Sequence, residues 1–142
     1  MKKVLSLFFA IIMIISVLSL TSCGYSSDSI VQGLKKANYT VGTYTPASFE
    51  EAQVTVALKT STIKGLKTVI HAFKTEDSKT TEEFIVLVFD SINSASALSE
   101  ADLSLLNDFA SKYTSHVLGT ANNVVYAGTS AAKEAAGIKT MF

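Results

Sequence analysis

Hydrophobic and polar positions divide the chain into one long uncharged segment near its beginning and a series of shorter periodic segments. Residues 4–20 carry no charged side chain, whereas the longest uninterrupted apolar run after them is FIVLVF, residues 84–89. A helix that crosses a bilayer needs about 20 apolar residues, so the later run suits a buried strand instead. The pattern therefore predicts an N-terminal segment that engages a membrane, followed by a folded part built of short elements.

The folded part is predicted to begin with a short helix and a strand. In residues 29–37, Ile30 and Leu34 share one side of a helix and Lys35 lies on the other. Residues 39–45, YTVGTYT, are mostly β-branched or aromatic, which favours a strand.

The next segment is ambiguous. Ser48 and Glu51 have the spacing of a capping box, in which the two side chains accept backbone N–H groups at the start of a helix. This predicts a helix that begins near Pro46 and continues through about Val56. Residues 53–59, QVTVALK, alternate between apolar and polar, which suits a strand equally well. We favour the helix because of its cap.

A β-hairpin is predicted in the middle of the chain. Residues 66–75 and 83–90 both have strand character, and the polar residues 76–82 between them form the expected extended tip. Because FIVLVF is apolar on both of its faces, we expect this strand to be central and covered on both sides.

The rest of the chain is predicted to be helical, then extended, then helical again. Apolar residues recur every three or four positions over residues 93–113, and a cap at Ser99 would give this helix an alternative start. Residues 119–123 contain a Gly and two Asn and indicate a turn. Residues 124–127 form a last strand and residues 130–136 a short helix.

Without the first helix, the predicted order is strand, helix, strand, strand, helix, strand and a terminal helix. This is the order of the split βαβ unit, so we expect an α+β fold: a small two-layer sandwich of ferredoxin-like βαββαβ type with extra N- and C-terminal helices. Its helices cover one sheet face, yet the hairpin is apolar on both. We expect the helix of residues 29–37 to cover the second face, with a second copy of the chain or a ligand as the alternatives.

The N-terminal segment has the features of a secretory signal. Lys2 and Lys3 precede the uncharged run, and the small residues Thr21 and Ser22 follow it immediately before Cys23. As a helix, the run spans about 26 Å, a little short of a hydrocarbon core of about 30 Å. The run is therefore a marginal permanent span.

Residues 20–23, Leu-Thr-Ser-Cys, resemble the lipobox of bacterial lipoproteins, and the resemblance covers residues 1–24. It implies that a diacylglyceryl group is attached to the sulfur of Cys23 and that a peptidase cuts before this residue. The domain would then be anchored by lipid to the cell membrane and would face the extracytoplasmic side, in the cell envelope. An uncut signal anchor and a conventional cleavage are the alternatives.

The resemblance also sets the domain organisation. We expect a signal peptide over 1–22, a lipid-anchored, flexible spacer over 23–28 and a single α+β domain over 29–142. Cys23 is the only cysteine in the sequence. Because it has no partner for an internal disulfide, its conversion to a thioether would remove a free thiol outside the cytoplasm.

Charge and motifs exclude several classes of function. Residues 23–142 carry 10 Lys against 12 Asp and Glu, and the sequence contains no Arg. This balance gives no reason to expect a nucleic-acid partner, and the lack of Arg disfavours a bidentate phosphate site. A phosphate-binding Gly loop, HExxH, CxxC and GxSxG are all missing from the sequence. We therefore predict neither a metal nor a cofactor.

Isolated side chains are the remaining candidates for chemistry. His71 shares a strand face with Val69 and Phe73, where a half-buried structural histidine is the leading interpretation and a ligand or base the alternative. Asp90 would supplement His71 if it approached across the hairpin, and Tyr44 is a further candidate. The acidic residues of the hairpin tip lack the spacing of a calcium loop. His116 is interpreted as an exposed group near the end of a helix.

From these observations we expect a membrane-anchored, non-enzymatic binding or accessory domain. Its partners would be the membrane, through lipid on Cys23, and a protein or a second copy of the chain on a sheet face. The alternative is a small envelope enzyme or ligand-binding domain that uses His71 with Asp90 or Tyr44.

Overall fold

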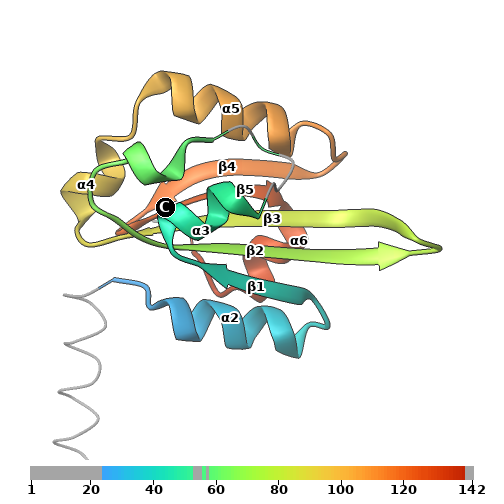
Figure 1. The fold of residues 1–142 in the computed structure, drawn as a ribbon. Coiled ribbons are helices and arrows are strands. Elements are labelled where there is room, and N and C mark those ends of the chain that lie inside the picture. Colours follow the sequence, from blue (N-terminus) through green and yellow to red (C-terminus); the bar gives the residue numbers. More distant parts are fainter. Residues whose placement is uncertain (1–23, 53–55, 57, 140–142) are drawn as a thin grey trace, which may run out of the picture.

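A computed structural model describes residues 24–52, 56 and 58–139, which form a five-stranded antiparallel sheet with helices on both faces (Figure 1). The strands are β1 (Thr40–Tyr44), β2 (Leu66–Glu76), β3 (Lys79–Phe89), β4 (His116–Ala121) and β5 (Val124–Thr129). The helices are α2 (Ser27–Lys36), α3 (Pro46–Glu51), α4 (Ile92–Ser96), α5 (Glu100–Ala110) and α6 (Ser130–Ala135), with a 3₁₀ turn at Thr60–Thr62. The expected small α+β fold is confirmed.

Two parts of the sequence prediction lie outside the described residues. They are the signal peptide over 1–22 with Cys23, and residues 53–55 and 57 of the ambiguous stretch over 53–59. Among the residues that the structure describes, no helix has both the length and the apolar character needed to cross a membrane.

The sheet differs from the ferredoxin-like arrangement in its strand order, which is β1-β2-β3-β5-β4. A βαβ unit connects parallel strands through a helix, whereas β1 and β2 are joined through α3 and pair antiparallel. Residues 116–121, for which the sequence pattern predicted no strand, form β4, which pairs with β5 across Asn122 and Asn123. An unpredicted edge strand therefore changes the topology.

The sheet separates two hydrophobic cores, so the described domain has three layers instead of two. Along β3, Phe84 and Val86 face α2 and α6, while Ile85 and Leu87 face the side of α3, α4 and α5. Alternate side chains of β3 therefore belong to different cores, and this central strand links the two. Burial of each such side chain contributes roughly 1.5–3 kcal/mol to the stability of the fold.

Helix α2 covers the sheet face that lacked a predicted partner. Its residues Ile30 and Leu34 are fully buried in the same core as Ile70 of β2. The intramolecular cover expected from the sequence is therefore confirmed. Within the described residues, each face of the sheet carries a hydrophobic core, and a protein or a second copy on a sheet face stays a prediction.

Strands β2 and β3 form a hairpin that extends beyond the other strands as an arm (Figure 1). Its turn consists of Asp77 and Ser78, which have positive φ values of 52° and 65°. Two such residues match the twist of the strands in a tight hairpin turn. The predicted extended tip over residues 76–82 is therefore wrong, since the strands continue to Glu76 and restart at Lys79.

Helix α3 is shorter than predicted. Thr45 is its N-cap and forms a capping box with Ser48, and the helix ends at Glu51 instead of near Val56. The Glu50 carboxylate accepts the backbone N–H of Ser61 at 2.8 Å and the Ser61 hydroxyl at 2.7 Å. These bonds hold the returning chain against α3, so a longer helix would carry the chain away from its contacts.

The long helix predicted over residues 93–113 is two helices. The first, α4, ends at Ser96, and Ser99 then caps α5 by accepting the N–H of Asp102 at 3.2 Å. The alternative start at Ser99 is confirmed. Because α5 ends at Ala110, Tyr113 lies in the loop that leads to β4.

The segment that follows Cys23 is attached to the domain. The N–H of Tyr25 donates to Oδ1 of Asn123 at 2.7 Å, and Nδ2 of Asn123 donates to the carbonyl of Tyr25 at 3.0 Å. Gly24 has a φ of 74°, and a Cβ built on it would lie 2.3 Å from Oδ1 of Asn123. The predicted flexible spacer therefore does not extend over Gly24 and Tyr25, because Gly24 lies close to the turn between β4 and β5 and Tyr25 is hydrogen-bonded to it.

Candidate functional site

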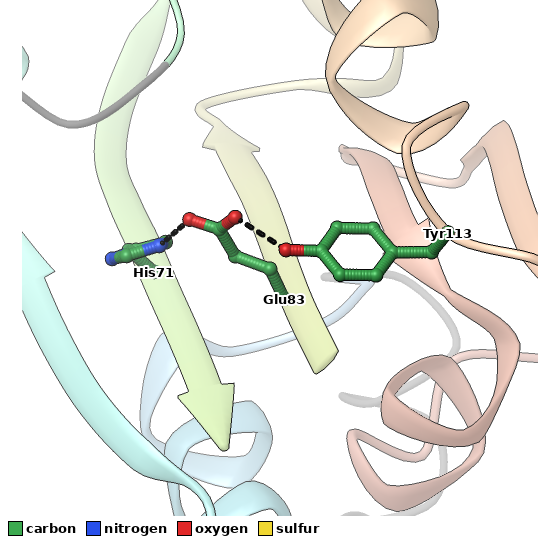
Figure 2. Close-up of polar contacts among 3 residues, drawn as sticks. All are labelled: His71, Glu83 and Tyr113. Carbon is green, nitrogen blue, oxygen red and sulfur yellow. Dashed lines mark hydrogen bonds and ion pairs between the residues drawn. The ribbon is translucent and has the colours of Figure 1, made fainter. Parts of the chain in front are cut away.

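Three polar side chains from β2, β3 and the loop after α5 form a chain on the sheet face that α3 and α5 cover. Oε2 of Glu83 lies 2.6 Å from Nε2 of His71, and the Tyr113 hydroxyl donates to Oε1 of Glu83 at 2.8 Å. Figure 2 shows the carboxylate between the imidazole and the phenol. Glu83 is thus held at both of its oxygens.

The strand register explains why His71 and Glu83 meet. His71 pairs with Ile85, and Phe73 pairs with Glu83, so the two residues are diagonal neighbours. Because side chains two positions apart point to the same face, His71 and Glu83 both project toward the α5 side. The His71 ring also stacks on Phe73, with ring centroids 5.4 Å apart.

Burial and charge together determine the ionisation of this cluster. Burial raises the pKa of Glu83, but hydrogen bonds from His71 and Tyr113 and the charges of His71 and Lys112 hold this pKa below its ordinary value. Burial, and then the hydrogen bond to and charge of Glu83, raise the pKa of Tyr113 well above its ordinary value. At neutral pH, Glu83 is therefore an anion and Tyr113 a protonated donor.

The cluster has the parts of an oriented base but little access to solvent. A carboxylate on one ring nitrogen fixes the orientation of an imidazole, which is how many enzymes hold a catalytic histidine. The side chains of His71 and Glu83 are only 12% and 10% exposed, however. A purely structural pair has the same geometry, because two buried polar side chains are stable only when each is hydrogen-bonded.

The structure does not bring Asp90 to His71. His71 is paired with Ile85, and Asp90 lies five positions farther along the chain, just after β3, where it is exposed. Five residues of strand correspond to about 17 Å. The N–H of Asp90 instead donates to the carbonyl of Gly65 at 2.8 Å.

Tyr44 lies closer to His71. It is on the same face of β1 as Gly42, the residue paired with His71, and a Cβ at Gly42 would lie 2.8 Å from the Tyr44 hydroxyl. The Tyr44 ring therefore occupies the space that a side chain at Gly42 would need. Its edge contact with Phe49 of α3, at a centroid distance of 5.6 Å, makes it part of the packing.

A second polar cluster lies on the opposite face of β3. The Tyr39 hydroxyl donates to Oε1 of Glu82 at 2.6 Å, and the Thr129 hydroxyl donates to the same oxygen at 3.3 Å. Lys74 Nζ lies 4.4 Å from the centroid of the Tyr39 ring. The consecutive residues Glu82 and Glu83 thus belong to two polar clusters on opposite faces of the sheet.

The described residues form two surface depressions, and the smaller one adjoins both polar clusters. The larger, of about 610 Å³, is lined by Lys64 before β2 and by residues from Asn93 to Asp102, with Lys64 and Asp102 as its charged groups. The smaller, of about 470 Å³, is lined by the hydroxyl-bearing residues Thr81, Tyr113, Thr129 and Ser130 together with Glu82 and Lys112. Tyr113 therefore connects the buried pair of His71 and Glu83 to a polar surface.

The remaining candidates do not add a metal centre. Within the described ranges, no group of three or more His, Cys, Asp or Glu side chains is arranged to hold a metal ion. His116 is exposed at the start of β4, and its Nδ1 lies 2.9 Å from the carbonyl of Tyr113. Cys23, the predicted lipidation site, is not among the described residues.

Sequence reasoning identified His71 but missed Glu83, which contacts His71, and Tyr113, which donates to Glu83. Glu83 was placed at the start of the second hairpin strand but was not related to His71, although its odd-numbered position in β3 places it with Ile85 and Leu87 on one face. The sequence could have revealed it, because a carboxylate at an alternate position of a strand lies on the same face as its buried apolar neighbours. Tyr113 comes from a loop, and its position depends on tertiary structure.

Comparison with protein families, with curated proteins and with solved structures finds no match for this chain. Its function is therefore inferred from the residues and their geometry.

Proposed function

We propose that this chain is an exported bacterial lipoprotein whose α+β domain is held at the outer side of the cell membrane by lipid on Cys23. The support from the sequence is the signal segment followed by Leu-Thr-Ser-Cys at residues 20–23. The support from the structure is that Gly24 and Tyr25 already contact Asn123. Because these contacts lie after the proposed cut, removal of residues 1–22 leaves them intact.

We further propose that the anchored domain is a binding or accessory domain and not an enzyme. The observation that carries this proposal is the burial of the pair formed by His71 and Glu83, whose reactive atoms contact each other and Tyr113. A general base needs an atom within hydrogen-bond reach of a substrate proton. With the imidazole 12% exposed and stacked on Phe73, its main role in this proposal is to stabilise the arm of β2 and β3.

Lipid attachment is tested in a bacterial host by metabolic labelling with palmitate and by the size of the protein on a gel. The wild-type chain is expected to take up label at its mature size, whereas Cys23→Ala is expected to take up no label and to keep the larger, unprocessed size. Cys23 is the only cysteine in the chain, so this substitution removes the single candidate sulfur. An unlabelled wild-type protein of mature size would contradict the proposal.

The role of His71 is tested by its reactivity toward diethyl pyrocarbonate, which modifies accessible imidazoles. The sequence contains two histidines, and the exposed His116 is a matched internal control. Rapid modification of His116 with protection of His71 in the folded protein, and modification of both in urea, would support a structural role. Equal rates in the folded protein would contradict it.

A ligand-binding domain is the second candidate, and the observation in its favour is the depression beside Tyr113. Several hydroxyl groups and Lys112 line it, which suits a small polar ligand, and Tyr113 would transmit occupancy to Glu83. Faster modification of His71 in Tyr113→Phe than in the wild type would show that the phenol shields the pair from this side, as the candidate requires. An unchanged rate would argue against it.

A further inference from the structure

One end of the sheet combines the beginning of the described chain with a buried acceptor that lacks a donor. Gly24 lies against Asn122 and Asn123 in the turn between β4 and β5. Asn123 binds both the N–H and the carbonyl of Tyr25 and also donates to the carbonyl of Phe89, at the end of β3, at 3.3 Å. Oδ1 of Asn122 is buried and has no hydrogen-bond partner in the described part of the chain, and it would lie 2.7 Å from a Cβ on Gly24.

This attachment leaves little slack between the domain and Cys23. Consecutive Cα atoms are about 3.8 Å apart, so the predicted lipidation site is within one residue of the turn at Asn122 and Asn123. A flexible spacer would let the domain rotate relative to its lipid. Two reciprocal hydrogen bonds immediately after the anchor restrict that rotation. We call the end formed by Gly24, Asp90, Ile92, Asn122 and Asn123 the anchor end.

The anchor end also carries an exposed apolar side chain. Ile92 is 50% exposed and is the one exposed large hydrophobic residue among those described. It follows Phe89 by three positions and starts helix α4, where Ser91 caps the first turn by accepting the N–H of Ser94 at 3.1 Å. A single exposed isoleucine is ordinary on a protein surface. Its position at the end of the domain nearest the lipid is the feature that needs an explanation.

The opposite end of the sheet has a different character. The arm of β2 and β3 ends there at Asp77 and Ser78, and the residues from Thr75 to Thr81 are exposed. Figure 1 shows the arm projecting away from the side on which α4 and the start of α2 lie. The arm tip is therefore polar and lies far from the predicted lipidation site, whereas the anchor end carries the exposed Ile92 and lies next to that site.

We propose that the anchor end rests on the phospholipid bilayer that holds the lipid on Cys23, with Ile92 in the membrane interface and the hairpin arm directed away from the membrane. The proposal rests on the lipidation proposed above and adds an orientation to it. Amphipathic contacts of this kind bury apolar side chains at the boundary between headgroups and acyl chains. The lipid on Cys23 and the apolar contact at Ile92 together fix an orientation that the lipid alone would not.

The test uses the full, lipidated protein with one engineered cysteine, since the sulfur of Cys23 is blocked as a thioether. The variants are Ile92→Cys at the anchor end, Asp77→Cys at the arm tip and Ser104→Cys on the exposed side of α5. Each is labelled with an environment-sensitive fluorophore and incorporated into phosphatidylcholine vesicles that contain lipids with a quencher on the acyl chain. The label at residue 92 is expected to shift its emission to shorter wavelength and to be quenched, and the labels at 77 and 104 to do neither.

A matched insertion variant tests the role of the short connection. A Gly-Ser spacer inserted after Gly24 is expected to keep the lipid but to abolish the shift and quenching at residue 92. If the lipidated protein without the spacer gives the same aqueous emission at 92 and 77, the orientation is wrong and the lipidation proposal stands. If Cys23 of the wild-type chain instead reacts with a maleimide, both the lipidation and the orientation are wrong.

Discussion

Glu83 lies 2.6 Å from His71 although the two residues are not directly paired in the hairpin. The contact is diagonal, from His71 on β2 to the residue opposite Phe73 on β3. Charged groups placed this far inside a protein are costly unless they are paired and hydrogen-bonded. The Tyr113 hydroxyl supplies the additional bond, so this face of the hairpin is held by one connected set of polar contacts.

Replacing His71 by Ala is expected to destabilise the fold. The substitution leaves Glu83 buried with one of its oxygens without the imidazole, which costs about 1–3 kcal/mol in the free energy of unfolding. His116→Ala is the matched control, because His116 is exposed and its loss is expected to change stability by less than about 0.5 kcal/mol. Urea unfolding followed by circular dichroism compares the two, and equal stabilities would contradict the structural role of the pair.

The contribution of Glu83 is expected to depend on pH. Its pKa is lower in the folded state than its ordinary value, so the unfolded chain binds the proton more readily in acid. The stabilisation by the carboxylate is therefore complete above the ordinary pKa of about 4.3 and is lost as the pH falls through the lowered pKa. The stability difference between the wild type and Glu83→Gln should shrink as the pH is lowered over this range. A difference that grows toward acid would have the wrong sign.

Asn123→Ala is expected to release the N-terminal segment. The substitution removes both hydrogen bonds to Tyr25 and the bond to the Phe89 carbonyl, at a cost of about 1–3 kcal/mol. Hydrogen exchange at the Tyr25 amide should accelerate, while Asn107→Ala on the exposed side of α5 should leave it unchanged. Continued protection of this amide in Asn123→Ala would show that other contacts hold the segment.

Gly33→Ala tests the contact between α2 and α6. Alanine raises helix propensity by about 1 kcal/mol over glycine, but a Cβ at Gly33 would lie 2.3 Å from the backbone carbonyl oxygen of Ala135. Because a backbone atom cannot move aside as a flexible side chain would, we expect a net loss of about 1–3 kcal/mol. Gln32→Ala, at an exposed position of the same helix, should be neutral or slightly stabilising. A gain in stability for Gly33→Ala would mean that α6 shifts or does not contact α2 closely.

The elements with strong periodicity could be predicted, and the weak edge strand could not. FIVLVF was predicted as a central strand and is part of β3, because its side chains are apolar on both faces. Strand β4 contains Gly119 and exposed residues such as Thr120, so its own sequence has little strand character. It forms because β5 offers it a complete set of backbone partners, which is a tertiary effect.

The candidate site required the register, which the sequence pattern did not give. Assigning residues 76–82 to an extended tip left Glu83 at the start of a strand and unrelated to His71. The tight turn at Asp77 and Ser78 extends both strands and places Glu83 diagonal to His71. Asp90 was the wrong partner for the same reason, since the register puts it about 17 Å away along the strand.

Mass spectrometry of the N-terminal peptide of the mature protein is the decisive measurement for lipid anchoring. If the chain is a lipoprotein, that peptide begins at Cys23, carries a diacylglyceryl thioether on the sulfur and continues into Gly24 and Tyr25. A mature protein that begins at any other residue, or that begins at Cys23 with a free thiol, would contradict it.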